Sequence, residues 1–124
     1  MNLSKLMTKI KNILYSILVA VFSLSLMSFT VVIDAGHGGD DFGAIGLVKG
    51  IKEKDLNLTV AKQLATKISQ KFPEVKVVLT RDTDIFLPLQ KRADIANKNH
   101  ADLFISIHTN AAENRKAQGA ETFI

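Results

Sequence analysis

The chain has 124 residues, a length that allows one domain at most. It contains no cysteine, which excludes disulfide bonds and thiolate metal sites, so any zinc must be held by histidine and carboxylate side chains. The chain has 16 basic and 12 acidic residues, but three of the lysines, Lys5, Lys9 and Lys11, lie in the N-terminal segment. The chain after this segment has 13 basic and 12 acidic residues, a net charge of +1. This charge gives no support for nucleic-acid binding.

The N-terminal residues have the pattern of an export signal. The three lysines precede an uncharged apolar run, Ile13 to Met27, and this order is typical of secretory signal peptides. We therefore predict a signal peptide over residues 1–28. The uncharged stretch from Asn12 to Ile33 is long enough for an uncleaved membrane anchor, but Val31–Ile33 is better used as a core strand. Both interpretations place the remaining chain outside the cytoplasm.

A short strand, a glycine-rich loop and a helix are predicted next. Val31–Ile33 is a β-branched run, which predicts a buried strand. Residues 34–50 hold six of the chain's seven glycines, a density that lets the backbone approach a ligand closely. Residues 53–70 have the pattern of an amphipathic helix. Its predicted apolar stripe repeats every four residues, at Leu56, Val60, Leu64 and Ile68.

The second half of the chain continues the alternation. Val75–Leu79 and Leu103–Ile107 are predicted strands, and between them Pro88 fits the first turn of a helix that runs to about Lys98. Gly119–Ile124 has the pattern of the start of a fourth strand. Strands that alternate with helices predict an α/β fold, with a twisted, mostly parallel sheet and helices on both faces. We expect this domain to be truncated after about the fourth strand.

Three side chains suited to metal binding are predicted to meet at one edge of this sheet. His37 follows the first strand, His108 follows the third, and Glu53 begins the intervening helix. Ligands of open α/β sheets collect at the carboxyl ends of strands, so these residues can face one ion. Two histidines and one carboxylate form a catalytic zinc set with a fourth position left for water. His100, in a polar connection, is expected to be solvated.

Each of these features has an alternative when taken alone. A glutamate at a helix N-terminus often serves the helix dipole. A histidine after a strand is often structural. The glycine-rich loop could cradle a phosphate, but it lacks the lysine of a Walker motif and the spacing of a dinucleotide-binding loop.

Four motifs follow one another at a specific spacing: Val32–Gly39, Gly50–Leu58, Leu79–Arg81 and Ser106–Ala111. Together they resemble the zinc-dependent N-acetylmuramoyl-L-alanine amidases of bacterial cell walls. The resemblance implies that residues 31–124 are the N-terminal part of an amidase catalytic domain. It also implies hydrolysis of the amide between N-acetylmuramic acid and L-alanine in peptidoglycan, with Zn²⁺ as the cofactor.

The resemblance further assigns residues to roles. The zinc ligands of the family fall on His37, Glu53 and His108. Arg81 and Asn110 become candidates for contact with the substrate. For Arg81 and for Arg92 of the second helix, the plainer role is a salt bridge, for which the available partners are Asp82, Asp84 and Asp94.

Two features depart from the family. Phe42 stands where relatives often have a proline, which alters the rigidity of the loop. The glutamate that acts as general base in the family is expected beyond Ile124, so no general base is assigned within this chain.

The resemblance also sets the expected partners and location. Peptidoglycan is the expected partner, and an activator protein is possible as a second one. No nucleic acid is expected, and the membrane is contacted only through the signal or anchor. The expected location is the periplasm or the exterior. One alternative is a truncated, catalytically inactive fragment that binds zinc or peptidoglycan. Another is a different zinc hydrolase such as a peptidase, which the sequences around His37 and His108 argue against.

Overall fold

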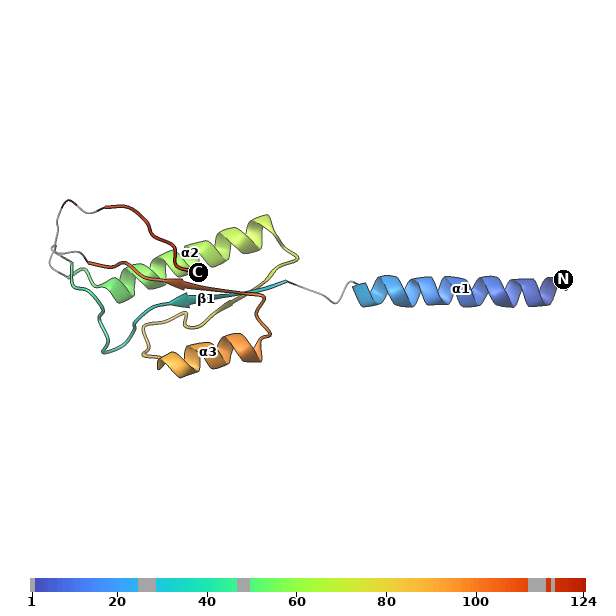
Figure 1. The fold of residues 1–124 in the computed structure, drawn as a ribbon, viewed down its shortest axis with the longest axis horizontal. Helices are drawn as coiled ribbons and strands as arrows, with labels where there is room; N and C mark the ends of the chain where they lie inside the picture. Colours follow the sequence, from blue (N-terminus) through green and yellow to red (C-terminus); the bar gives the residue numbers. More distant parts are fainter. Residues whose placement is uncertain (1, 25–28, 47–49, 112–115, 117) are drawn as a thin grey trace.

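The structure, a computed structural model, describes residues 2–24 (backbone only for 20–24), 29–46, 50–111, 116 and 118–124. In these residues the chain forms an α/β unit preceded by a helix (Figure 1). The predicted strands and helices between Val31 and Ile107 are confirmed, with ends shifted by at most two residues. The elements are α1 (Leu3–Leu24), β1 (Thr30–Ala35), α2 (Glu53–Lys71), β2 (Lys76–Leu79), α3 (Leu89–Lys98) and β3 (Leu103–Ile107).

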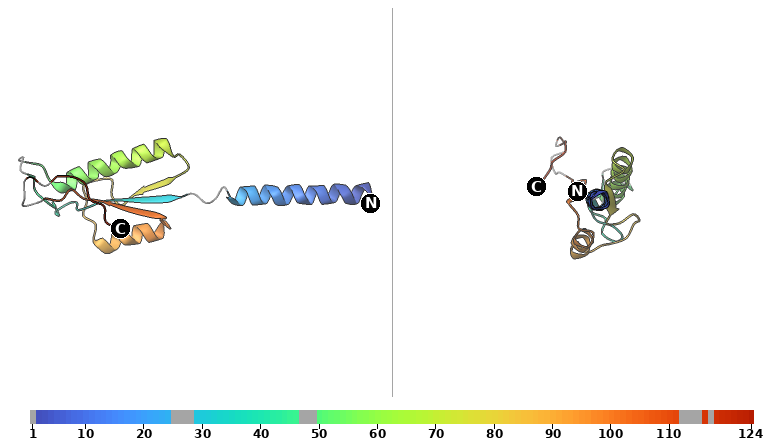
Figure 2. Two further views of the ribbon diagram at one scale, coloured as in Figure 1. Left: turned by 45° about the horizontal axis from the view of Figure 1, so that its top comes forward. Right: turned by 90° about the vertical axis from the view of Figure 1, so that its right-hand side faces the viewer.

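The sheet is parallel, and β1 lies at its centre in the order β2-β1-β3. Every residue of β1 is buried, which explains its uninterrupted apolar run. Helices α2 and α3 lie on opposite faces of the sheet (Figures 1 and 2), as predicted. Ala35 pairs with Ile107 at the ends of β1 and β3. The segments that carry His37 and His108 therefore leave the sheet side by side.

The apolar stripe predicted for α2 is wrong in its first half. Leu56 and Val60 are 43% and 42% exposed, whereas the row that faces the sheet begins with Glu53, Asn57 and Ala61. Residues three and four apart share a helix face, so this row continues into the partly buried Leu64 and Ile68. The error arose because the first three buried residues of the helix, Glu53, Lys54 and Asn57, are polar, and a search for apolar periodicity does not detect them.

The fourth strand predicted from Gly119 is not formed. Residues 118–124 have no regular secondary structure, and Gly119 has a φ of 136°, outside the strand region. A strand requires a neighbour that pairs with its backbone, and Ala120–Ile124 remain exposed. The β-branched and aromatic residues at this position therefore do not suffice to form a strand.

Helix α1 lies clear of the α/β unit in Figure 1 and in the left-hand view of Figure 2. Its described apolar side chains are largely exposed, for example Leu14 at 61% and Leu18 at 66%. Across the described part of the chain, no helix combines the length and apolar character needed to cross a membrane. Residues 25–28 of the predicted signal peptide lie outside the described residues.

Candidate metal centre

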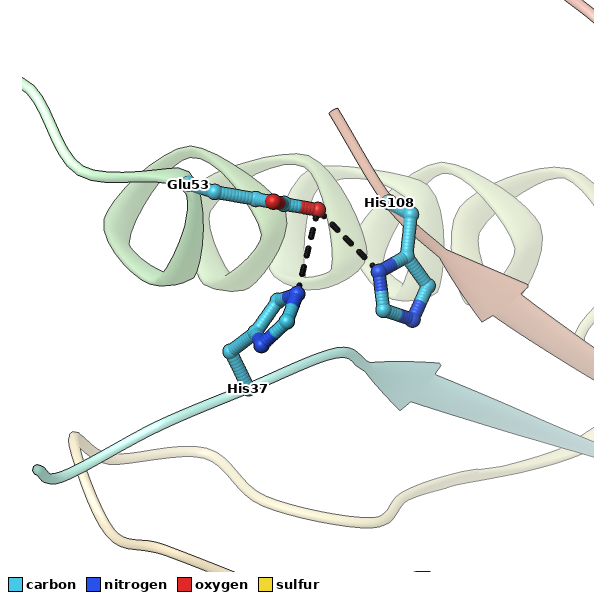
Figure 3. Close-up of side chains that lie close together, drawn as sticks. All are labelled: His37, Glu53 and His108. Atoms are coloured by element: carbon cyan, nitrogen blue, oxygen red, sulfur yellow. Dashed lines mark hydrogen bonds and ion pairs between the residues drawn. The ribbon is translucent and has the colours of Figure 1, made fainter. Parts of the chain in front are cut away.

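His37, Glu53 and His108 converge at the carboxyl edge of the sheet (Figure 3). Nε2 of His37 lies 3.3 Å from Oε1 of Glu53, and Nδ1 of His108 lies 3.0 Å from the same oxygen. One ligand atom from each residue lies within 4.8 Å of the others. The three residues come from the end of β1, the start of α2 and the end of β3, as predicted from the sequence.

The geometry and the donor types fit a zinc ion. In a tetrahedral site with metal–ligand distances of about 2.0 Å, neighbouring ligand atoms lie about 3.3 Å apart. The two measured separations, 3.3 and 3.0 Å, are close to that value. Two neutral imidazoles and one carboxylate would leave a divalent ion with a net positive charge and an open coordination position. This arrangement is suited to catalysis more than to a structural site.

Glu53 is buried and is held in its ionised form. Its Oε2 accepts the backbone N–H of Ala44 at 2.8 Å, and its Oε1 accepts that of Thr109 at 3.0 Å. Burial alone would raise the pKa of Glu53, but the hydrogen bonds from Ala44, Thr109, Asn57 and His108 outweigh it and lower the pKa. The carboxylate is thus charged at neutral pH, as a metal ligand must be.

Two glycines of the predicted loop leave room for the ligand side chains. A Cβ atom on Gly36 would lie 2.4 Å from Nε2 of His108. A Cβ atom on Gly43 would lie 2.6 Å from Cδ2 of His37 and 2.7 Å from Oε2 of Glu53, and Gly43 also has a φ of 62°. At these two positions any larger residue would displace a ligand.

His37 has an uncommon backbone conformation, with a φ of 62°. The guanidinium of Arg92 holds this residue in place, because Nη2 donates to the carbonyl of His37 at 2.8 Å. The imidazole is fixed separately, since Nδ1 lies 2.9 Å from Oδ2 of Asp41. Backbone strain of this kind persists only where surrounding contacts enforce it, and such positions cluster at functional sites.

The two arginines have other partners than the acidic residues suggested by the sequence. Arg81 is 2% exposed and donates to the backbone carbonyls of Ala35, Gly36 and Lys54, each at 2.9 Å. This arrangement supports the loop from inside and gives Arg81 a structural role. Asn110, the other residue proposed to face the substrate, is exposed.

Arg92 forms a buried ion pair with Asp34 that sequence reasoning missed. Nη1 of Arg92 lies 2.8 Å from Oδ1 of Asp34, and the two residues are 5% and 3% exposed. Thr80 donates to the same carboxylate at 2.6 Å and Ser106 at 2.8 Å, so one side chain connects the ends of all three strands. The feature of the sequence that could have indicated this network is a polar residue at or near the end of each apolar strand: Asp34, Thr80 and Ser106.

The network fixes the charge of Asp34. Burial alone would raise the pKa of this carboxyl, but the hydrogen bonds from Thr80, Arg92 and Ser106 outweigh it and hold the pKa below its ordinary value of 3.8. The ionised form therefore contributes to stability above pH 3.8, and that contribution is lost as the pH falls through the lowered pKa.

A buried lysine ties the glycine-rich loop to the neighbouring loop. Lys54 is 5% exposed, and its Nζ donates to the carbonyl of Gly39 and to Asp84. Phe42 covers this region, with its ring 3.9 Å from Nζ of Lys52 and 5.0 Å from Nζ of Lys54. Cation–π contacts thus hold the position at which the sequence has an aromatic residue instead of proline.

A cleft of about 650 Å³ opens beside His37 and His108. It runs along α3, and its lining includes Phe86, Leu89 and Phe104 as well as His37 and His108. A ligand in this cleft would therefore have apolar surface on one side and the two imidazoles at one end.

Comparison with known proteins gives consistent matches to one family. The family model described as N-acetylmuramoyl-L-alanine amidase matches residues 31–124. The chain is 45% identical over 93 residues to the N-acetylmuramoyl-L-alanine amidase AmiC of Escherichia coli O6:H1, which covers 75% of this chain and 22% of AmiC.

Solved structures agree. The N-acetylmuramoyl-L-alanine amidase AmiC2 of Nostoc punctiforme matches with a TM-score of 0.65 and 48% identity over 71% of this chain and 47% of that one. An N-acetylmuramoyl-L-alanine amidase from Clostridium difficile 630 matches with a TM-score of 0.68 and 44% identity, over 73% and 48% of the two chains. This chain thus spans less than half of the length of each of these three proteins.

Replacing Arg92 by alanine should destabilise the fold by about 3–5 kcal/mol, because the carboxylate of Asp34 would remain buried without its cation. The pKa of Asp34 should then rise, so acid unfolding should begin at a higher pH than in the unsubstituted protein. Urea unfolding at pH 7 and an acid titration followed by circular dichroism measure both effects. Lys91→Ala, at the exposed neighbouring position, is the control. Equal stability of the two variants would contradict the role assigned to the pair.

Proposed function

Because the chain belongs to the N-acetylmuramoyl-L-alanine amidase family, we propose that it provides the metal-binding part of an active site that hydrolyses the amide bond between N-acetylmuramic acid and L-alanine in peptidoglycan. The observation that carries the proposal is the convergence of His37, Glu53 and His108 around a space that fits a zinc ion. The match of the family to residues 31–124 supports the choice of substrate.

The proposed chemistry divides between the metal and the protein. Zinc held by this set would polarise the carbonyl of the scissile amide and lower the pKa of a water molecule. Glu53 supplies the negative charge among the ligands, and its Oε1 lies 3.3 Å from Nε2 of His37 and 3.0 Å from Nδ1 of His108. The cleft that ends at His37 and His108 offers space for the muramyl peptide.

Hydrolysis also needs a group that accepts a proton from water and returns it to the leaving amine. Within the residues that the structure describes, the carboxylates in contact with the two histidines are Glu53 and Asp41, and both have other partners. Glu121 lies in the irregular, exposed segment after Gly119. We therefore assign no general base among the described residues.

A second candidate is a non-catalytic product that binds zinc or peptidoglycan. One observation favours it: the carboxylates in contact with His37 and His108 among the described residues are Glu53 and Asp41, and both already have other partners.

We also propose that residues 1–28 direct export and are then removed. The support is the order of the sequence: three lysines, then an apolar run that forms most of α1, Leu3–Leu24. Cleavage would release the α/β unit toward the cell wall, where its proposed substrate lies.

Zinc binding should depend on two of the three histidines. His37→Ala and His108→Ala should each lose stoichiometric zinc, and Glu53→Gln should weaken zinc binding while leaving the fold intact, because each change removes one ligand. Metal analysis of the purified protein and circular dichroism measure these effects. His100→Ala is the matched control, since His100 is exposed and lies outside the cluster. Full zinc retention in His37→Ala would refute the assignment.

Cleavage of peptidoglycan should depend on the metal. In a zymogram with purified peptidoglycan, run on a protein that joins this chain to a segment carrying the expected general base, we expect clearing that a chelator abolishes and added Zn²⁺ restores, with none from His37→Ala and normal clearing from His100→Ala. Clearing that a chelator leaves unchanged would exclude the zinc mechanism. Stoichiometric zinc without clearing would instead support the non-catalytic candidate.

Export should shorten the chain. When the gene is expressed in a secreting bacterial host, the intact mass of the exported protein should correspond to cleavage near residue 28, because the basic and apolar segments before it act as a signal. A membrane-bound product with the mass of all 124 residues would favour the anchor instead.

A further inference from the structure

A tight turn after β1 brings Asp41 back against His37. Gly38 and Asp41 exchange two backbone hydrogen bonds, of 3.0 and 3.1 Å, and Gly39 within the turn has a φ of 58°. The turn places Oδ2 of Asp41 2.9 Å from Nδ1 of His37. The contact is therefore produced by the backbone and does not depend on the chance position of a flexible side chain.

The carboxylate of Asp41 is itself held in one orientation. Its other oxygen, Oδ1, accepts the backbone N–H of Gly43 at 3.1 Å. The turn is anchored in addition by Asp84, which accepts the N–H of Gly39 at 2.8 Å, and by Lys54, which donates to the carbonyl of Gly39 at 2.8 Å. Both oxygens of Asp41 therefore face nitrogen atoms: Oδ1 accepts the N–H of Gly43, and Oδ2 lies against Nδ1 of His37, where a carboxylate oxygen acts as an acceptor.

We propose that Asp41 is a positioning residue that sets the tautomer and the ring orientation of His37 for metal binding. A neutral imidazole carries one N–H, and a hydrogen bond to the carboxylate oxygen 2.9 Å from Nδ1 places that N–H on Nδ1. The lone pair is then left on Nε2, which is the nitrogen that lies 3.3 Å from Oε1 of Glu53. The inference rests on the proposed function, because it takes His37 to be a metal ligand.

The two histidines differ in the nitrogen that they direct toward Glu53. His37 presents Nε2, whereas His108 presents Nδ1 at 3.0 Å. Among the described residues, Asp41 is the carboxylate bonded to the outer nitrogen of His37. Carboxylates that hold the second nitrogen of a metal-binding histidine raise its basicity and fix its direction, and their loss typically weakens metal binding by about 10- to 100-fold.

The test replaces the carboxylate by an amide of the same shape. In Asp41→Asn the amide oxygen can still accept the N–H of Gly43, but the amide nitrogen beside Nδ1 favours the tautomer with its proton on Nε2. We expect zinc affinity, measured on the full chain by competition with a chromophoric chelator, to fall about 10- to 100-fold. Asp40→Asn, at the exposed adjacent position, should bind zinc like the unsubstituted protein.

A spectroscopic readout separates positioning from folding. In the zinc-loaded, unsubstituted protein, ¹⁵N–¹H correlation spectra of the imidazoles should show His37 with its proton on Nδ1 and zinc on Nε2. A proton on Nε2 of His37 would overturn the proposal, even if Asp41→Asn failed to fold. Unchanged affinity in a folded Asp41→Asn variant, or an equal loss in Asp40→Asn, would also overturn it.

The same measurements distinguish this inference from the function on which it rests. If His37→Ala loses zinc and Asp41→Asn keeps it, the ligand set stands and only the positioning role fails. If His37→Ala keeps stoichiometric zinc, the ligand set itself is wrong.

Discussion

The rest of the site depends on the contacts of one buried carboxylate, that of Asp34. It accepts hydrogen bonds from Thr80 at the end of β2, Ser106 in β3 and Arg92 in α3, and it belongs to β1. Three strands and one helix are thus aligned within a few residues of the point where the metal-ligand residues leave the sheet. Removing a charge from water is costly, and this geometry offsets the cost by giving the carboxylate several donors.

Arg92, which pairs with Asp34, also supports the backbone after β1, together with Arg81. The chain must turn sharply there so that His37 can face Glu53, and the turn leaves carbonyls without partners in the sheet. Arg92 and Arg81 supply them: both donate to the carbonyl of Ala35, Arg81 to that of Gly36, and Arg92 to that of His37. An unpaired buried carbonyl costs about as much as a lost hydrogen bond, so the two guanidiniums stabilise a loop that the sheet alone would not support.

Local patterns in the sequence were enough to predict the elements between Val31 and Ile107 and the convergence of His37, Glu53 and His108. The run Val31–Ile33 and the glycines after it place His37 at a strand end, and the topology rule for open α/β sheets brings His108 beside it. The partners of Arg92 and the buried face of α2 were not predictable in the same way. Arg92 reaches Asp34 across 58 positions in the sequence, and Asn57 is buried because it contacts the site. Both facts depend on tertiary neighbours that no local pattern encodes.

In the proposed function, metal binding and proton transfer depend on different parts of the protein. The proposed ligands and the residues that orient them lie between Asp34 and Thr109, and their hydrogen bonds are satisfied within that range, since no buried polar side-chain atom lacks a partner in the described chain. A proton acceptor, by contrast, has to approach the open coordination position from outside this set. The proposed metal site can therefore form without a proton acceptor beside it. Under this proposal, zinc affinity measures the integrity of the scaffold around Asp34, whereas hydrolysis also requires the proton acceptor.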